Sequence, residues 1–207
     1  MKKKHKVREF ETVKEYSRWK YFCDYYLKYV IAVIFIGILS VTFVKEVFID
    51  KVNTVLYIAI LNENKWLETE NLVKELEDYF QINTDKEEII ISIYNLEENS
   101  DLSKFYTLIA NGQIDIVITD NKVAQYFDEQ GYLLNLEQLG LRDSELSDQL
   151  LKGDNSKSQY GISLVDNKKY QQLESSLEEP VLSIISNSAR QSEVKILLSY
   201  LANNDLN

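Results

Sequence analysis

TVLYIAIL, residues Thr54 to Leu61, is an unbroken apolar run of strand length that begins with two β-branched residues. A strand that is apolar at every position, instead of at every second position, is typical of a sheet buried on both faces. The next stretch, ENKWLETENLVKELEDYF, spaces its apolar residues three or four positions apart and predicts an amphipathic helix. The sequence therefore opens its folded part with a buried strand followed by a helix.

The same alternation continues toward the carboxyl terminus. Two further apolar runs, Ile89 to Tyr94 and Ile114 to Thr119, are each followed by a stretch with helical spacing. After Pro180 the strand pattern returns, and a last helix is predicted at 189–202. Strands that alternate with helices at this spacing predict right-handed crossovers. We therefore expect an α/β fold with a mostly parallel sheet and helices on both faces.

The folded part contains one segment with a different pattern. Residues 54–139 and 178–207 form the predicted main lobe. The residues between them, 140–177, are polar, with one short candidate strand at 160–165 and a weak helical pattern at 168–177. We expect this segment to be an insertion or a vestigial second lobe.

Upstream of the first strand lies YVIAVIFIGILSVTFV, Tyr29 to Val44, which contains no charged residue. With its flanks it extends to residues 27–49, which is long enough for a transmembrane helix in a lipid bilayer. A buried core helix would show a polar face, whereas this run offers only Ser40 and Thr42. A cleaved secretory signal would have a shorter basic region and an A-x-A-like site, so we expect an uncleaved signal-anchor.

The charges beside the predicted span indicate its orientation. Residues 1–28 carry nine Lys or Arg and four acidic residues, whereas only Lys45 and Lys51 follow the span closely. The positive-inside rule therefore predicts a single-pass plasma-membrane protein with a cytoplasmic amino terminus. The predicted parts are a basic cytoplasmic tail or amphipathic helix at 1–26, the anchor at 27–49 and an extracellular α/β domain at 51–207.

Composition excludes several functions for the outer domain. The whole chain carries a net charge of −10 and residues 1–28 carry +5, which leaves −15 for residues 29–207. That charge disfavours nucleic acid and anionic lipid as partners of this domain. The one histidine and the one cysteine, His5 and Cys23, precede the span, so no zinc site is expected. Cys23 is either an ordinary small apolar residue or a palmitoylation site.

Sequence motifs for catalysis are missing from the chain. It has no phosphate-binding loop, no dinucleotide-binding glycine pattern and no nucleophile elbow. Asp115 lies inside a predicted strand, where an unpaired charge is costly. We expect Asp115 to accept hydrogen bonds from a neighbouring backbone or to pair with a lysine, and we predict neither an enzyme nor a cofactor.

The stretch ANGQIDIVITDNKVAQYFDEQGYLLNLEQL, Ala110 to Leu139, resembles extracellular solute-binding proteins of bacterial transporters. In that family a G-x-x-D-[IV]-[VI] strand is followed by a short helix and then by a segment with a glycine and leucines. The matching positions are Gly112, Asp115, Ile116, Val117, Gly131, Leu134 and Leu136. The resemblance implies a type 2 periplasmic-binding-like fold and an outward location in a Gram-positive-type bacterium. Family members clamp a ligand between two lobes, whereas this chain has room for one lobe and has no lipobox.

Ligands of open α/β sheets bind outside the carboxyl ends of the strands. Amide, hydroxyl and indole groups follow the predicted strands, and such groups suit a small polar or sugar-like ligand. The other interpretation is that these residues cap helices or shape turns. The candidate ligand-binding residues are Asn62, Asn64, Trp66, Tyr94, Asn95, Thr119, Asp120, Asn121, Ser186 and Asn187.

Together these observations predict a single-pass membrane protein that displays a non-catalytic, solute-binding-like domain outside the cell. The predicted role is binding of a small polar ligand, or service as an accessory to membrane proteins of a transporter or envelope complex. The alternative is a structural or assembly protein of a membrane complex that binds no small molecule.

Overall fold

The computed structural model of the chain describes residues 19–20, 22–23, 25–44, 52–62, 66–140, 146–153 and 158–203. The chain separates into two compact units, residues 1–51 and 52–207. In the first unit, helix α2 spans Leu27–Val44. Its apolar side chains are exposed along the helix, and the Phe35 side chain, for example, is 61% exposed.

Among the helices that the structure describes, none is both long enough and apolar enough to cross a lipid bilayer. Residues 45–49 of the predicted span and residues 1–18 of the predicted tail lie outside the described part of the chain.

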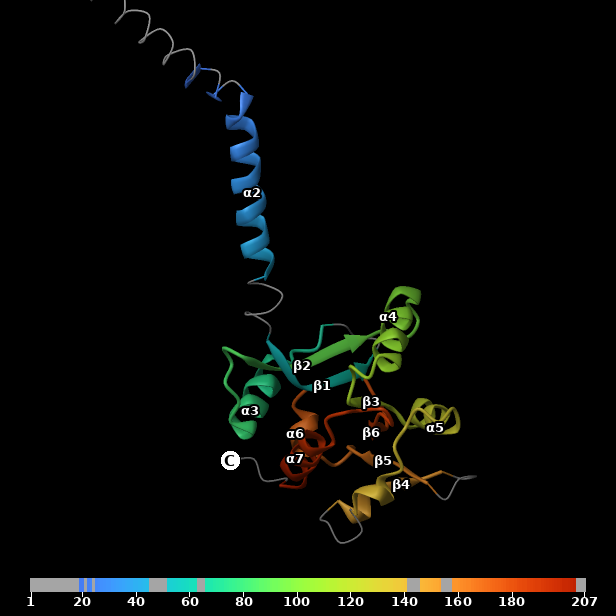
Figure 1. Cartoon of the computed structure of the whole chain (residues 1–207). Coiled ribbons are helices and arrows are strands. Elements are labelled where there is room, and N and C mark those ends of the chain that lie inside the picture. Colours follow the sequence, from blue (N-terminus) through green and yellow to red (C-terminus); the bar gives the residue numbers. More distant parts are fainter. Residues whose placement is uncertain are drawn as a thin grey trace, which may run out of the picture. The chain divides into compact units, whose positions relative to one another are not determined.

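The second unit is a mixed α/β domain built around one six-stranded sheet (Figure 1). The strand order across the sheet is β2-β1-β3-β6-β5-β4. Along the chain the elements are β1 (Asn53–Leu61), α3 (Glu70–Phe80), β2 (Glu87–Tyr94), α4 (Asn99–Ala110), β3 (Ile116–Asp120), α5 (Asn121–Glu129), the 3₁₀ turns η2 (Leu136–Leu139) and η4 (Ser147–Gln149), β4 (Leu150–Lys152), β5 (Gln159–Ser163), α6 (Lys168–Gln171), β6 (Pro180–Ile184) and α7 (Gln191–Ala202).

The sheet is mixed, which corrects the prediction of a mostly parallel sheet. Strand β1 pairs in parallel with β2 and with β3. The pairs β3–β6, β5–β6 and β4–β5 are all antiparallel. Three of the five strand pairs are therefore antiparallel.

Residues 164–179, which join β5 to β6, contain one short helix and no crossover helix of the usual length. A parallel connection between neighbouring strands usually runs through a helix that carries the chain back to the starting edge. Helix α6 has only four residues, and the predicted helical pattern at 168–177 ends at Gln171. Glu174 has a left-handed backbone, with a φ of 47°, which marks a turn. The chain therefore stays at the edge where β5 ends, and β6 returns in the opposite direction.

Helices cover both faces of the sheet, as the apolar run of β1 predicts. Alternate residues of β1 point to opposite faces. Leu56, Ile58 and Ile60 belong to a core with side chains of α3, α6 and α7. Tyr57, Ala59 and Leu61 belong to a second core with side chains of α4 and α5. Every residue in this part of β1 thus contributes to one of two cores.

Residues 140–177 contribute to the main sheet. Strands β4 and β5 both lie in this segment and extend the sheet beyond β6. Leu146 and Tyr160 are buried, with 2% and 1% of their surfaces exposed. The described part of this segment is therefore built into the same domain.

Candidate functional site

The predicted ligand-binding residues lie at two different edges of the sheet. We call the edge at which β1, β2 and β3 end the carboxyl edge, and the opposite edge the amino edge. In the antiparallel pair β3–β6, Pro180 lies opposite Asp120, and Ile184 lies opposite Ile116. Ser186 and Asn187, which follow β6, are therefore at the amino edge. The structure does not bring them together with the candidates at the carboxyl edge, because β6 runs antiparallel to β3.

At the carboxyl edge, the segment 172–179 makes hydrogen bonds with the residue that follows β1. Asn62 is only 3% exposed. Its amide donates to the Ser175 hydroxyl at 3.0 Å, and its side-chain oxygen accepts a hydrogen bond from Ser176. The Tyr170 hydroxyl donates to the same Ser175 oxygen at 2.8 Å. The end of β1 is thus occupied by the chain itself.

Burial removes two more candidates from the surface. Tyr94 is 2% exposed and Thr119 is 1% exposed. The hydroxyl groups of Tyr94 and Tyr57 are 2.6 Å apart and share a hydrogen bond. Burial, followed by this hydrogen bond, raises the pKa of Tyr94 above its ordinary value. Its phenol therefore stays neutral and serves the packing of the sheet against α4.

Asn95 shapes a turn, which is the role predicted if the candidate residues do not bind a ligand. Its side-chain oxygen accepts a hydrogen bond from the backbone N–H of Glu97 at 2.9 Å. Its own backbone N–H donates to the Asp101 carboxylate at 3.1 Å. Both contacts shape the turn between β2 and α4.

Polar side chains remain partly exposed at the end of β3. Asn121 accepts a hydrogen bond from the Tyr160 hydroxyl at 2.6 Å and donates to the Glu179 carboxylate at 3.3 Å. The Gln125 amide donates to the same Tyr160 oxygen at 3.4 Å. Asp120 accepts from the backbone N–H of Glu179 at 3.3 Å. We call Asp120, Asn121, Gln125, Tyr160 and Glu179 the β3 polar cluster.

The residues that follow β1 differ in exposure. The Trp66 side chain is 90% exposed. Asn64 lies outside the described residues. Of the three candidates after β1, one is buried and one is largely open to solvent.

At the amino edge the polar residues shape turns and stabilise the ends of helices. The Asn187 amide donates to the Ile109 carbonyl at 2.8 Å and so caps the last turn of α4. Gly112 has a φ of 64°, and a Cβ there would lie 3.3 Å from the Asn187 carbonyl oxygen, so a side chain would fit poorly. The Ser186 hydroxyl donates to the Gly131 carbonyl at 3.3 Å.

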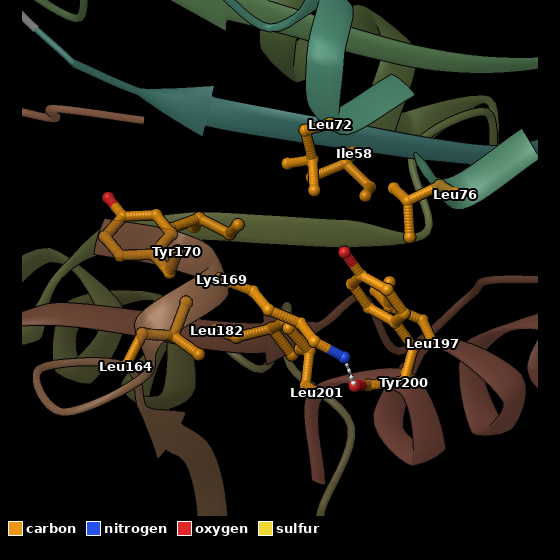
Figure 2. Close-up of a pocket in the computed structure, with 11 residues that line it drawn as sticks. Ile58, Leu72, Leu76, Leu164, Lys169, Tyr170, Leu182, Leu197, Tyr200 and Leu201 are labelled. Carbon is orange, nitrogen blue, oxygen red and sulfur yellow. Dashed lines mark hydrogen bonds between the residues drawn. The ribbon is translucent and has the colours of Figure 1, made fainter. Parts of the chain in front are cut away.

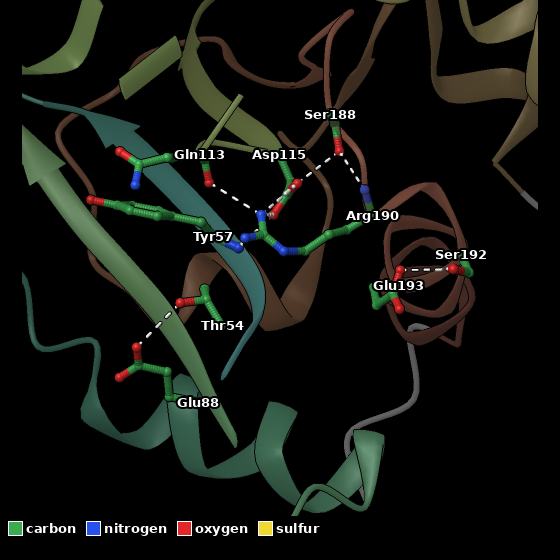
Figure 3. Close-up of polar contacts among 9 residues, drawn as sticks. All are labelled: Thr54, Tyr57, Glu88, Gln113, Asp115, Ser188, Arg190, Ser192 and Glu193. Atoms are coloured by element: carbon green, nitrogen blue, oxygen red, sulfur yellow. Dashed lines mark hydrogen bonds and ion pairs between the residues drawn. The ribbon is translucent and has the colours of Figure 1, made fainter. Parts of the chain in front are cut away.

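Asp115 and Arg190 form a clamp at the same edge (Figure 3). The Asp115 carboxylate is fully buried. It accepts hydrogen bonds from the Tyr57 backbone N–H at 2.8 Å and the Ser188 hydroxyl at 2.7 Å. Arg190 Nη1 lies 2.9 Å from one Asp115 oxygen and 3.1 Å from the other, and it also donates to the Gln113 carbonyl. The carboxylate is fully engaged, which fits a structural role.

Asp115 makes the expected types of contact, but its charged partner differs from the expected one. Its contacts include a backbone N–H, as expected, but the cation is an arginine and not a lysine. The sequence carried one signal that could have identified Arg190. It is the one basic residue between Pro180 and the start of α7.

The domain has a small apolar cavity between the sheet and α3, α6 and α7 (Figure 2). Its volume is about 20 Å³, which is room for roughly one water molecule. Lys169 lies beside it, with its ammonium group 2.6 Å from the Tyr200 carbonyl and 3.7 Å from the centre of the Tyr200 ring. A sugar or amino acid does not fit this space.

An open hollow of about 500 Å³ lies at the amino edge, beside the start of β1 and the end of α3. Its lining mixes apolar residues such as Phe80 with the charged residues Glu87, Arg190 and Glu193. Within the described ranges, no group of three or more His, Cys, Asp or Glu residues is arranged to hold a metal ion.

Comparison with known proteins gives a partial similarity to solved structures. No protein-family model and no curated protein matches the chain. An extracellular solute-binding protein family 1 member from Alicyclobacillus acidocaldarius aligns with 55% of this chain and 28% of its own, at 22% identity and a TM-score of 0.35.

Two further structures align in a similar way. A transporter solute-binding protein from Thermotoga lettingae, bound with α-D-tagatose, aligns over 54% of this chain and 28% of its own, at 21% identity and a TM-score of 0.39. A substrate-binding protein from Listeria monocytogenes, in complex with cycloalternan, aligns over 55% of this chain and 29% of its own chain. The identity is 20% and the TM-score is 0.37. The chain thus spans less than a third of each, and similarity at this level does not identify its function.

Proposed function

We propose that this chain is a single-pass membrane protein that displays a non-catalytic α/β domain outside the cell, as an interaction module of a transporter or envelope complex. In this proposal the domain does not capture a free solute. Residues 27–49 are the anchor, residues 1–26 are cytoplasmic and residues 51–207 are outside.

The anchor is supported by the chemistry of α2 and of its flanks. No charged residue occurs between Tyr29 and Val44, and the apolar side chains of α2 are exposed on all its sides. Exposure of apolar surface to water costs about 25 cal/mol per Å². Such a helix therefore favours contact with lipid or with other apolar helices. The excess of Lys and Arg in residues 1–28 favours a cytoplasmic amino terminus.

One observation carries the proposed role of the domain: the chain itself occupies the end of β1, and the candidate residues Asn62, Tyr94 and Thr119 are buried. Asn62, Tyr94 and Thr119 are 3%, 2% and 1% exposed. Two serines of the segment 172–179 hydrogen-bond to Asn62. A solute would have to displace this segment before it reached the end of β1.

An exposed aromatic residue at the same edge suits a protein partner. Trp66 follows β1 and is 90% exposed. Tryptophan is enriched at protein interfaces, where its large ring is buried by the partner. The net charge of −15 after residue 28 favours a partner with a basic surface.

The first test measures solute binding to the purified full chain in mild detergent. A panel of sugars, polyols, amino acids and short peptides is added, and the melting temperature is recorded. A ligand at about 100 times its dissociation constant would add about 2.7 kcal/mol to the unfolding free energy and raise the melting temperature by about 5–10 °C. We expect no compound to do so, and a rise of this size would contradict the proposal.

The second test looks for the protein partner in cells. A photocrosslinking amino acid replaces Trp66, and a second variant carries it in place of Lys195, an exposed residue of α7. We expect one discrete adduct with another membrane protein from position 66 and none from position 195. Equal adducts from both positions would indicate random collisions and would contradict the proposal.

A second candidate function, binding of a small polar ligand, is favoured by the β3 polar cluster. Its amide and carboxylate groups lie together at the end of β3 and remain partly exposed, with the buried Tyr160 hydroxyl beneath them. If a compound in the panel raises the melting temperature, Tyr160→Phe and Asn121→Ala should each reduce that shift. A shift that both variants retain would place the ligand elsewhere.

A further inference from the structure

The two outer strands of the sheet differ in how they are protected. An open strand edge offers unpaired backbone groups to other chains, and proteins protect such edges with short strands, lysines and irregular pairing. Strand β4 has all three features, since it has three residues, includes Lys152 and pairs irregularly with β5. Strand β2 has eight residues, EEIIISIY, with no lysine or proline.

Backbone hydrogen bonds identify the open part of β2. The carbonyls of Lys86 and Tyr94 accept hydrogen bonds from β1 and the residue after it, at 2.8 Å and 3.0 Å. Because successive residues of a strand point their backbone groups to opposite sides, Ile89, Ile91 and Ile93 direct theirs away from β1. Within the residues that the structure describes, no hydrogen bond reaches these groups from the outer side.

Hydrogen bonds within the chain occupy the backbone N–H groups at both ends of this open part of β2. The backbone N–H of Glu87 donates to the Asn83 carbonyl at 2.8 Å. The backbone N–H of Asn95 donates to the Asp101 carboxylate at 3.1 Å. The free groups therefore run from Ile89 to Ile93 and are centred on Ile91.

We propose that this edge pairs with the same edge of a second copy of the chain, antiparallel, with Ile91 on the two-fold axis. In this register Ile89 lies opposite Ile93 of the second copy, and Ile91 lies opposite Ile91. Such a two-fold pair uses the open edge of both copies and leaves none exposed. Aliphatic pairs across the two strands add to the backbone hydrogen bonds.

Charge selects the antiparallel arrangement over a parallel one. Glu87 and Glu88 stand at one end of β2, and the rest of the strand is uncharged. A parallel copy would place each glutamate beside its own counterpart. In the antiparallel register, Glu88 lies opposite Tyr94 of the second copy, and the two Glu88 residues are about 20 Å apart, beyond the Debye length of about 8 Å at physiological salt. The inference does not depend on whether the domain binds a solute.

The test uses single cysteines in the full chain, in a Cys23→Ser background, within the membrane. The Cα atoms of Ile91 in the two copies would be about 5.5 Å apart, which is within the disulfide range of about 4.4–6.8 Å. On mild oxidation, Ile91→Cys should form a covalent dimer. Ile89→Cys and Ile93→Cys should not do so alone, because each lies about 13 Å from its own counterpart. Co-expression of these two variants should give the mixed dimer.

Two results of the cysteine experiment would overturn the inference. Efficient dimers from all three single variants would indicate a parallel or a random arrangement. No dimer from Ile91→Cys or from the mixed pair would exclude this edge as the interface.

A second measurement needs no cysteine. Ile91→Pro removes an N–H that points away from β1, so it should leave the pairing with β1 intact and block the second copy. Sedimentation of the full chain in detergent should show a monomer for Ile91→Pro and a dimer for the conservative control Ile91→Val. A dimer that persists in the folded proline variant would also overturn the inference.

Discussion

At the residue scale, the clamp between Asp115 and Arg190 ties three parts of the domain together. Asp115 precedes β3, its carboxylate accepts from the backbone of β1, and Arg190 precedes α7. A fully buried carboxylate without its cation is costly, because the protein interior solvates a charge poorly. The clamp therefore links the start of α7 to β1 and to the residue before β3.

We predict that Arg190→Met lowers the unfolding free energy by about 3 kcal/mol, the lower end of the range for a broken buried pair, because Arg190 is itself partly exposed. The melting temperature should fall by about 6–12 °C. The control Lys195→Met changes an exposed residue of α7 and should alter the unfolding free energy by less than about 0.5 kcal/mol. Adding Asp115→Asn to Arg190→Met should restore part of the loss, since no unpaired charge remains. Equal melting temperatures for Arg190→Met and Lys195→Met would contradict the clamp.

The buried phenol of Tyr170 makes the unfolding free energy depend on pH. Burial raises the pKa of this phenol to about 12. Below pH 10 the phenol is neutral in both the folded and the unfolded chain. Above about pH 10 it ionises in the unfolded chain but stays neutral in the folded one, so the folded state loses stability until about pH 12. We predict that Tyr170→Phe makes the fall in unfolding free energy between pH 9 and 11 less steep, as measured by urea denaturation. Identical slopes for both proteins would show that Tyr170 does not contribute.

The sequence could predict the chemical type of most site residues but not their partners. Asn95, Ser186 and Asn187 make the turn and cap contacts that are typical of their residue types. The sequence could not pair Arg190 with Asp115, because 74 positions separate the two residues. They come close only when β3 pairs with β6. The two serines that bond to Asn62 were missed for the same reason.

At the scale of elements, the segment 172–179 covers the end of β1. Its contacts with Asn62 come from Ser175 and Ser176. These are side-chain hydrogen bonds that substitution can remove without altering the sheet.

We predict that Ser175→Ala with Ser176→Ala lowers the unfolding free energy by about 1–3 kcal/mol, because the buried Asn62 side chain loses two hydrogen bonds. Adding Asn62→Leu should recover part of this loss, since the polar group is then gone. The control Ser199→Ala, on the exposed side of α7, should have little effect. Urea denaturation measures all three. A double variant as stable as the control would show that the segment is not held by these bonds.

The sequence predicted the position of β2 and β3 but not the direction of β6. Continuous apolar runs mark strands buried on both faces. The structure confirms a strand at Ile89 to Tyr94, and the strand predicted at Ile114 to Thr119 begins two residues later, at Ile116. Apolar periodicity carries no information on strand direction, and β6 pairs antiparallel with both β3 and β5. Strand β4 has three residues, too few for its pattern to be recognised.

At the scale of the whole molecule, the chain combines an apolar helix with an acidic α/β domain. The lobe of a solute-binding-like fold was expected from the sequence, and the structure confirms a mixed α/β domain with helices on both faces. The proposed position of the domain outside the cell rests on the charge asymmetry around residues 27–49.

Protease digestion of intact spheroplasts tests this placement most directly. Antibodies against epitopes at the two termini of the full chain follow the cleavage. We predict that external protease removes the carboxyl-terminal epitope and spares the amino-terminal one until the cells are lysed. Protection of the carboxyl-terminal epitope in intact spheroplasts, with digestion after lysis, would contradict the account.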